Sequence, residues 1–268
     1  MINEKICLDE KNPEVFIETF VPDTIKFRVL DAILIIPGGG YSWVCDFKEG
    51  EPIALEFASK GYACFVLHYS VKEKAKFPLP LIQASRAMKH IKDNAEKYNL
   101  NPERVFAIGF SAGGHLCASL GSLWHMDEIY REIDMEYGYN KPKATMLIYP
   151  VITSDERYAH IASFHRLLGT ENPSEEELNR YSIEKCVSEK TVPAFLVHTA
   201  SDAGVNVNNS LLLAQSFNEY KIPFEMHIFP TGRHGCALGS DITADFPDMS
   251  YPSLAMWPTL AKMWMDRM

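Results

Sequence analysis

The sequence has no long apolar run, no basic cluster and no closely spaced pair of cysteines. No stretch of about 18 uninterrupted apolar residues occurs, so no segment is expected to span a membrane. The formal net charge is −9 and the Lys and Arg residues are scattered. Nucleic acids and anionic membranes need a local positive potential, so neither is an expected partner. We expect a small, neutral molecule instead.

The cysteines and the N-terminal residues both favour a cytoplasmic protein. Six cysteines are present without a C-x-x-C spacing, which predicts separate reduced thiols rather than a disulfide framework or a zinc site. The segment Met1–Glu10 carries acids where a signal peptide would be basic, and it has no sustained apolar core.

Apolar runs alternate with segments of helical spacing, and this pattern predicts an α/β fold with a mostly parallel central sheet and helices on both faces. The 268 residues carry no linker-like stretch, so we expect a single domain over 1–268. The expected strands are Ala32–Ile36, Ala63–Tyr69, Arg104–Gly109, Ala144–Tyr149, Ala194–His198 and Phe224–Phe229. Helices are expected over Leu81–Ala95, from Ser111, over Asn209–Tyr220 and around Trp257–Trp264.

Residues at about 153–190 interrupt this alternation, because they are polar and carry a helix start of their own. Ser174 can cap that helix while Glu177 bonds back to it. An insertion after a strand's carboxyl end lies over the site end of an α/β sheet. Two interpretations stay open: a partial lid, or a surface excursion without contact to the site.

A nucleophile turn is predicted at Gly109-Phe-Ser111-Ala112-Gly113, which lies between an expected strand and an expected helix. In this context G-x-S-x-G forces a sharp reversal that exposes the serine hydroxyl above the sheet. The helix that follows directs free N–H groups at the reacting atom, and Ala112 would supply one oxyanion donor. Ser111 is therefore the predicted nucleophile.

The glycine run Pro37-Gly38-Gly39-Gly40-Tyr41 follows the first strong strand, where this fold type keeps its second source of oxyanion donors. Without Cβ atoms, the N–H groups can approach a substrate oxygen closely. We expect Gly39 and Gly40 to donate. A structural turn or a phosphate site are alternatives, although neither phosphate-binding glycine motif is present.

The predicted base is His234, which lies among turn residues after the last expected strand. The predicted acid is Asp202, after the preceding strand, which gives the chain order Ser, Asp, His. Three other histidines are expected to be core residues with satisfied hydrogen bonds, and His115 to point away from the serine. These three are His68, His198 and His227. Asp155 is a rival for the acid, whereas three later aspartates come after His234: Asp241, Asp245 and Asp248.

These motifs together resemble the bacterial acetyl-esterase and acetylxylan-esterase-like α/β-hydrolases, often labelled sugar or xylan esterases. The similarity rests on the glycine run, the nucleophile turn and four further segments: Tyr149–Thr153, His198–Asp202, Asn209–Leu211 and His227–Gly235. It implies hydrolysis of short acyl esters, acetyl groups on small sugars or xylo-oligosaccharides, with no metal and no organic cofactor. One departure is Ala203-Gly-Val-Asn206, which lacks the proline that commonly follows the acid.

Other functions remain open on the sequence. A formamidase or other amidase, or a small peptidase, could share the glycine run and the nucleophile turn. A non-catalytic binding protein could keep the fold. The aromatic residues Trp43, Phe47 and Trp124 are candidates for the pocket, with core packing as the alternative. The acyl and sugar preference and the oligomeric state, a homo-oligomer included, are not determined by the sequence.

Overall fold

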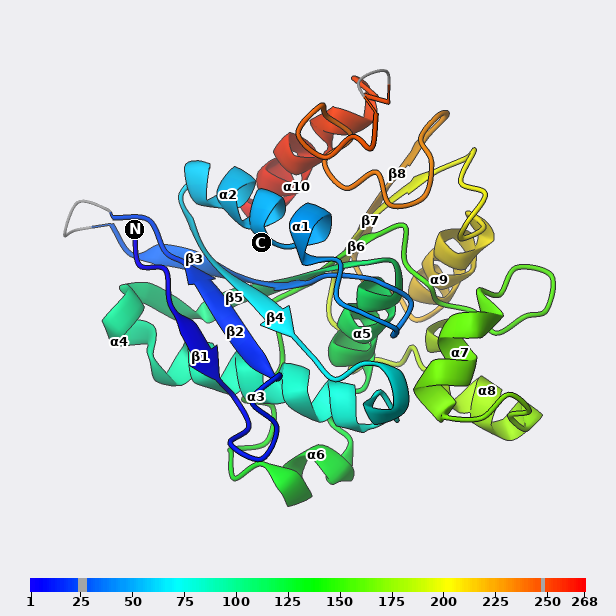
Figure 1. The fold of residues 1–268 in the computed structure, drawn as a ribbon, viewed down its shortest axis with the longest axis horizontal. Helices are drawn as coiled ribbons and strands as arrows, with labels where there is room; N and C mark the ends of the chain where they lie inside the picture. Colours follow the sequence, from blue (N-terminus) through cyan, green and yellow to red (C-terminus); the bar gives the residue numbers. More distant parts are fainter. Residues whose placement is uncertain (24–27, 247–248) are drawn as a thin grey trace.

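The computed structural model describes residues 1–23, 28–246 and 249–268. Within them, eight strands form one sheet in the order β1-β2-β4-β3-β5-β6-β7-β8 (Figure 1). The first two strands run antiparallel to their neighbours, and β3 to β8 are mutually parallel. The predicted α/β fold with a mostly parallel sheet is confirmed. The sheet takes strands from residues 5 to 229, and the single domain over 1–268 stays a prediction.

All six expected strands are present, with ends that differ by a few residues. They are β3 (Leu30–Ile36), β4 (Tyr62–His68), β5 (Leu100–Phe110), β6 (Thr145–Ile148), β7 (Ala194–Thr199) and β8 (Phe224–Phe229). Most are apolar throughout because helices cover both faces. The edge strand β8 is the exception, since its residues are exposed or half-buried.

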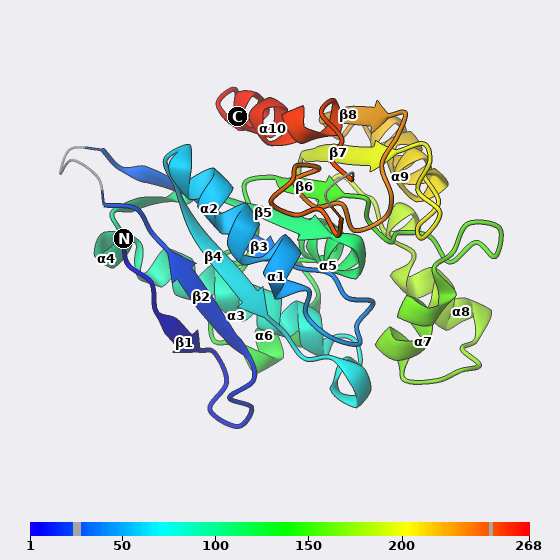
Figure 2. The same ribbon diagram turned by 45° about the horizontal axis from the view of Figure 1, so that its top comes forward.

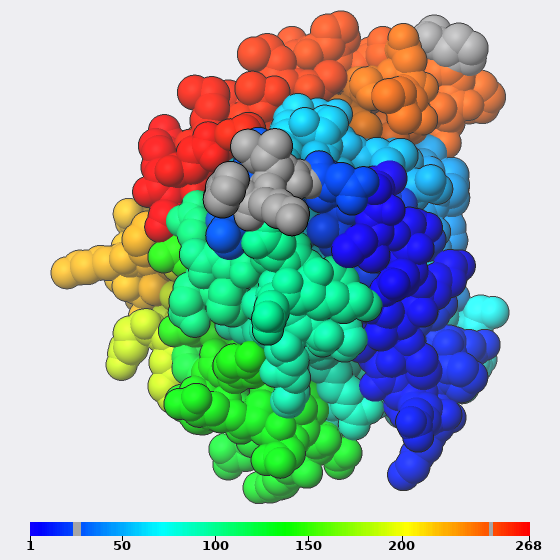
Figure 3. Space-filling view, turned by 90° about the vertical axis from the view of Figure 1, so that its left-hand side faces the viewer, coloured from blue at the N-terminus to red at the C-terminus, as the bar shows by residue number. Residues whose placement is uncertain are grey.

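Two strands, β1 (Lys5–Cys7) and β2 (Phe16–Phe20), were not predicted. Both are short and carry charged residues, so neither has the apolar run that identifies the parallel strands. They extend the sheet beyond β4, and Figure 3 shows the blue N-terminal residues beside the teal surface of the segment near residue 90. Lys97 donates a hydrogen bond of 2.7 Å to Glu4 across this boundary.

Helices form a layer on each face of the sheet (Figure 2). One layer holds α3 (Leu79–Asp93), α4 (Ala95–Tyr98), α5 (Ser111–Ser122), α6 (Asp127–Glu132) and α9 (Asn208–Glu219). The other holds α1 (Asp46–Glu49), α2 (Glu51–Ser59) and α10 (Trp257–Met265). An apolar core lies between the sheet and each helix layer. Trp257 of α10 is fully buried in the core on the α1, α2 and α10 side. All four expected helices are present.

The segment predicted as an insertion holds α7 (Ile161–Leu168), α8 (Glu175–Tyr181) and a short 3-10 turn at Ile183–Lys185. The predicted cap of α8 is confirmed: Ser174 accepts a hydrogen bond from the N–H of Glu177, and the Glu177 carboxylate accepts one from the N–H of Ser174. Figure 2 places α7 and α8 beyond the carboxyl ends of the parallel strands.

None of the helices in the described part of the chain is both long and apolar enough to cross a membrane. The cysteines of the described residues are free thiols. The cytoplasmic location stays a prediction.

Candidate active site

Ser111 lies at the junction of β5 and α5 with a φ of +53°, a conformation that side chains other than glycine rarely adopt. The chain can turn this sharply because Gly113 leaves room. A Cβ on Gly113 would lie 2.2 Å from the carbonyl oxygen of Ile36 and 2.3 Å from that of Pro37. The glycine run therefore packs directly on the turn that carries Ser111. Such strain is typical of functional positions.

The three residues predicted as nucleophile, base and acid are hydrogen-bonded in series. His234 follows β8, and its Nε2 lies 2.7 Å from the Oγ of Ser111. Its Nδ1 lies 2.8 Å from the Oδ2 of Asp202, which follows β7. A carboxylate can only accept here, so Nδ1–H donates to Asp202 and the Nε2 lone pair is free to accept the Ser111 proton. The imidazole is half-buried, which keeps the site within reach of solvent.

The Asp202 carboxylate is held by contacts on both of its oxygens. Oδ1 accepts hydrogen bonds from the backbone N–H of Gly204 at 2.8 Å and of Val205 at 2.9 Å. The Nε2 of His198 lies 3.4 Å from Oδ2 and 3.0 Å from the carbonyl oxygen of Val205. Burial raises the pKa of Asp202, but hydrogen bonds from His198 and His234 outweigh it and hold the pKa well below its ordinary value. The loop Ala203–Asn206, which lacks the proline that commonly follows the acid, is fixed by the hydrogen bonds of Gly204 and Val205 to Asp202.

The rival acids have other partners or positions. Asp155 accepts two hydrogen bonds from the Arg157 side chain, at 2.9 and 2.6 Å. Asp245 pairs with Lys48, and Asp241 is exposed. Asp248 lies outside the described residues. Among the aspartates that the structure describes, the contact to His234 is therefore made by Asp202.

The predicted oxyanion donors have free N–H groups. Within the described chain, no hydrogen-bond partner is found for the backbone N–H of Gly39, Gly40 or Ala112. The glycines have φ values of +117° and +62°, and Ala112 is in the first turn of α5, where helix N–H groups have no partner inside the helix. These N–H groups are available to a negatively charged substrate oxygen.

A further residue of the site, not predicted from the sequence, is Glu49, whose buried carboxylate joins the glycine run to the loop of His234. Its Oε2 accepts the N–H of Gly38 at 2.8 Å, and its Oε1 accepts the Tyr149 hydroxyl at 2.9 Å. The Tyr149 oxygen in turn accepts the N–H of Ala237 at 2.9 Å. Burial raises the pKa of Glu49, and the two hydrogen bonds offset part of that effect. Glu49 belongs to no recognisable motif, so only the fold reveals it.

Two of the four remaining histidine predictions are confirmed. His115 does point away from Ser111: its Nδ1 accepts the Tyr41 hydroxyl at 2.9 Å and its Nε2 donates to Tyr181 O at 2.8 Å. His198 is a buried residue whose Nδ1 accepts from Ser210 at 2.8 Å.

The other two predictions are wrong. His68 is not satisfied, because its buried Nε2 has no hydrogen-bond partner among the described residues. His227 is not a core residue, because β8 is a half-exposed edge strand; its Nε2 lies 2.9 Å from Glu225.

The predicted insertion contacts the glycine run. Arg166 of α7 donates to the carbonyl oxygen of Gly40 at 3.3 Å. The ring of His160, the residue directly before α7, lies beside Gly40. A Cβ added to Gly40 would be 4.0 Å from the Cε1 of His160, which is an ordinary van der Waals distance. Burial lowers the pKa of His160, and the nearby His234 lowers it further. The segment thus borders the glycine run, and its action as a partial lid stays a prediction.

Of the three aromatic candidates for the pocket, two are exposed. Trp43 and Phe47 are 47% and 64% exposed, and their rings stack at 5.9 Å. A Cβ on Gly39 would lie 3.4 Å from the Cδ1 of Trp43, so the indole borders a predicted oxyanion donor. Trp124 is buried and donates to the carbonyl oxygen of Lys190, which is core packing.

Several known proteins are similar to this chain in sequence and in fold. The BD-FAE family model matches residues 18–217. Endo-1,4-beta-xylanase B of Butyrivibrio fibrisolvens is 42% identical over 216 residues, which cover 79% of this chain and 33% of that protein. The acetylxylan esterase of Xylanibacter ruminicola is 29% identical over 224 residues, or 82% of this chain and 43% of that protein. The chain thus spans less than half the length of these two relatives.

A solved structure matches over almost its whole length. The crystal structure of an acetyl ester-xyloside bifunctional hydrolase from Caldicellulosiruptor lactoaceticus is 34% identical with a TM-score of 0.84, covering 98% of this chain and 96% of that chain. The resemblance inferred from the sequence motifs is confirmed. With the fold, the matched family model and this structural relative in agreement, the chain is an α/β-hydrolase that belongs to the BD-FAE family.

Proposed function

We propose that this protein is a serine carboxylesterase that removes short acyl groups, acetyl above all, from small sugars or xylo-oligosaccharides. One observation carries the proposal: the Ser111, His234 and Asp202 side chains are hydrogen-bonded in series at 2.7 and 2.8 Å on a strained strand-to-helix turn. The acyl group and the sugar are inferred from the relatives, which are named acetylxylan esterase and acetyl ester-xyloside hydrolase.

The first step is acylation. His234 Nε2 takes the hydroxyl proton as Ser111 Oγ attacks the ester carbonyl carbon, because an unassisted serine hydroxyl is a weak nucleophile. The negative charge on the carbonyl oxygen is stabilised by N–H groups of Gly39, Gly40 and Ala112. Asp202 keeps Nδ1 protonated and stabilises the imidazolium. His234 then gives the proton to the leaving sugar oxygen, and the C–O bond to the sugar breaks.

The second step is deacylation of the acyl-Ser111 intermediate. His234 accepts a proton from water, the resulting hydroxide attacks the acyl carbonyl, and the same N–H groups stabilise the second oxyanion. Collapse returns the proton to Ser111 Oγ and releases acetate. His234 thus carries one proton from Ser111 to the leaving sugar oxygen in the first step and one from water to Ser111 in the second.

The experiment compares Ser111→Ala with Ser119→Ala. Ser119 is buried on the same helix α5, and its hydroxyl bonds to the carbonyl oxygen of His115 at 2.8 Å. We expect Ser111→Ala to lose hydrolysis of p-nitrophenyl acetate and labelling by a fluorophosphonate probe at an unchanged melting temperature, while Ser119→Ala keeps both. Retained turnover in Ser111→Ala would refute the assignment, and an unlabelled wild type would favour a non-catalytic binding protein.

Substrate class is tested on the wild type with acetylated xylobiose, N-formylkynurenine and a short peptide amide. We expect kcat/KM to be highest for the acetylated sugar. A higher value for the formyl amide would make the protein an amidase with the same machinery, and cleavage of the peptide would make it a peptidase.

A further inference from the structure

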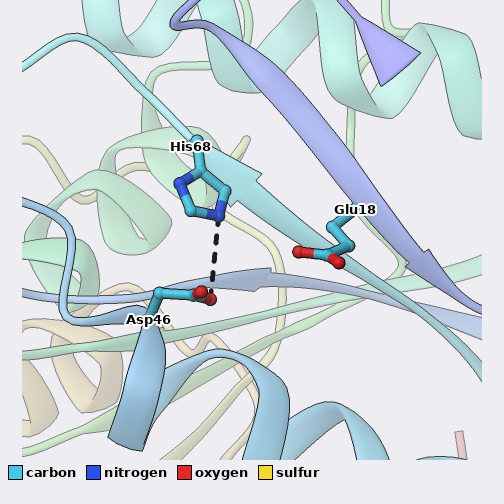
Figure 4. A group of neighbouring side chains, drawn as sticks. All are labelled: Glu18, Asp46 and His68. Carbon is cyan, nitrogen blue, oxygen red and sulfur yellow. Dashed lines mark ion pairs between the residues drawn. The ribbon is translucent and has the colours of Figure 1, made fainter. Parts of the chain in front are cut away.

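Three side chains that could bind a metal converge where β2, β4 and α1 meet. Glu18 belongs to β2, His68 is the last residue of β4, and Asp46 is the first residue of α1. In the β2–β4 register Glu18 is opposite Val66 and Phe16 is opposite His68, so Glu18 and His68 lie on the same face. Figure 4 shows the three side chains pointing toward a common space. We call them the edge cluster.

The distances in the edge cluster suit a bridging ion better than direct contacts. One ligand atom from each residue lies within 4.8 Å of the other two. The Nε2 of His68 is 3.7 Å from Oδ1 of Asp46, which is too long for a hydrogen bond. Both of these atoms are buried and have no hydrogen-bond partner within the described chain. Buried polar atoms without partners are unfavourable and rare, so the arrangement points to a missing ligand.

The charge and the neighbours of the edge cluster also fit a cation. Two carboxylates and a neutral imidazole carry two negative charges, which one divalent ion neutralises. Lys5 is opposite Glu18 in the β1–β2 register, yet its ammonium lies over the Phe16 ring at 5.2 Å. Phe16 stacks on the His68 imidazole at 4.1 Å and 14°, which fixes the orientation of that ring. The stacking leaves the Nε2 atom at the edge of the ring directed at Asp46.

We propose that Glu18, Asp46 and His68 bind one divalent cation, Zn²⁺ in the first place. One imidazole nitrogen and two carboxylate oxygens are ligands that Zn²⁺ takes, with a further position left for water. The site is separate from the proposed ester hydrolysis and does not rest on it. Its role is structural: it joins β2, β4 and the first residue of α1, the helix whose last residue, Glu49, holds the glycine run.

The test is calorimetric titration of Zn²⁺ into the full chain, free of any purification tag and stripped with a chelator. We expect one saturable site and a melting temperature that rises by several degrees at saturating Zn²⁺, because an ion that binds the native state alone stabilises it. His68→Gln, Asp46→Asn and Glu18→Gln should each weaken binding at least about tenfold and remove most of the thermal shift, with each loss worth about 1.4 kcal/mol or more.

The matched control is His227→Gln. His227 is another histidine of the same sheet beside a carboxylate, Glu225, but among the described residues it belongs to no group of three possible metal ligands. The His227→Gln variant should bind Zn²⁺ with the stoichiometry, the affinity and the thermal shift of the wild type. If His68→Gln fails to fold, the more conservative Glu18→Gln carries the test. No saturable binding, or binding that the three cluster variants leave intact, would overturn the proposal and make the cluster an ion pair between His68 and its acids.

Discussion

The Oε2 of Glu49 accepts a hydrogen bond of 2.8 Å from the backbone N–H of Gly38, at the start of the glycine run. This bond occupies the N–H of Gly38, whereas no partner within the described chain is found for the N–H groups of Gly39 and Gly40. Through Tyr149 the same carboxylate reaches the N–H of Ala237, three residues after His234. Glu49 therefore sets the position of two loops that must meet over Ser111.

We expect Glu49→Gln to lower kcat for p-nitrophenyl acetate by roughly ten- to a hundredfold with little change in KM. A misplaced oxyanion donor acts on the transition state, and loss of a donor altogether costs about 10²–10³ in kcat. The control is Glu51→Gln, on the exposed side two residues away. Equal loss in both variants, or a rise in KM alone, would contradict a positioning role.

The contact between Asp202 and His234 predicts a large effect of a nearly isosteric change. Asp202→Asn should lower kcat by about 10⁴, because an amide favours the wrong tautomer of the imidazole. The rival acid supplies the control: Asp155→Asn removes a carboxylate that pairs with Arg157, and activity should stay within twofold of wild type. Steady-state kinetics of both variants on p-nitrophenyl acetate decide whether Asp202 or Asp155 is the acid. Strong loss in Asp155→Asn instead would move the acid to that loop.

Sequence patterns predicted the strands whose residues are mostly apolar. Strands buried on both faces are apolar throughout, so β3 to β7 can be found from runs of apolar residues alone. The two N-terminal strands escaped because they are short and pair antiparallel at an edge, where polar side chains are tolerated. Their place is set by the long-range pairing of β2 with β4 and by the pairing of β1 with β2, which local sequence does not encode.

The site divides in the same way. Ser111, Asp202 and His234 could be predicted because chain order and turn residues mark them. Glu49 could not, because its role depends on Gly38 and Tyr149, which are 11 and 100 residues away. His68 was misjudged for a related reason: an apolar strand predicts a buried histidine, but the fold brings two carboxylates to it from β2 and α1.

The buried His115 predicts a stability that falls with acidification. Burial lowers its pKa from 6.5 to about 4, so the folded state resists protonation while the unfolded state does not. Its contribution is fully present above pH 6.5 and is lost as the pH falls toward 4; the difference corresponds to about 3 kcal/mol.

Urea unfolding of wild type and His115→Gln between pH 7 and 4.5 measures this effect. Stability of the wild type should fall more steeply, by up to about 1.4 kcal/mol per pH unit. Other titrating groups are common to both proteins and cancel in the comparison. Parallel curves for wild type and His115→Gln would exclude His115 as the source.

The exposed indole of Trp43 predicts how the leaving group is recognised. Its Cδ1 borders Gly39, and the ring is 47% exposed, so a sugar attached to an ester at Ser111 has an apolar surface beside it. Covering part of that ring contributes roughly 1–2 kcal/mol. Trp43→Ala should therefore raise KM for acetylated xylo-oligosaccharides about tenfold while p-nitrophenyl acetate, which carries no sugar, changes less than threefold.

The control for this variant is Tyr220→Ala, which removes an aromatic side chain of equal exposure, 47%, at the end of α9. It should change kcat/KM for neither substrate. The ratio of the two kcat/KM values in each variant is the quantity to compare, because it cancels any general loss of activity. A Trp43 variant that lowers both substrates equally would mean that the indole supports the glycine run, and that sugar recognition depends on other side chains.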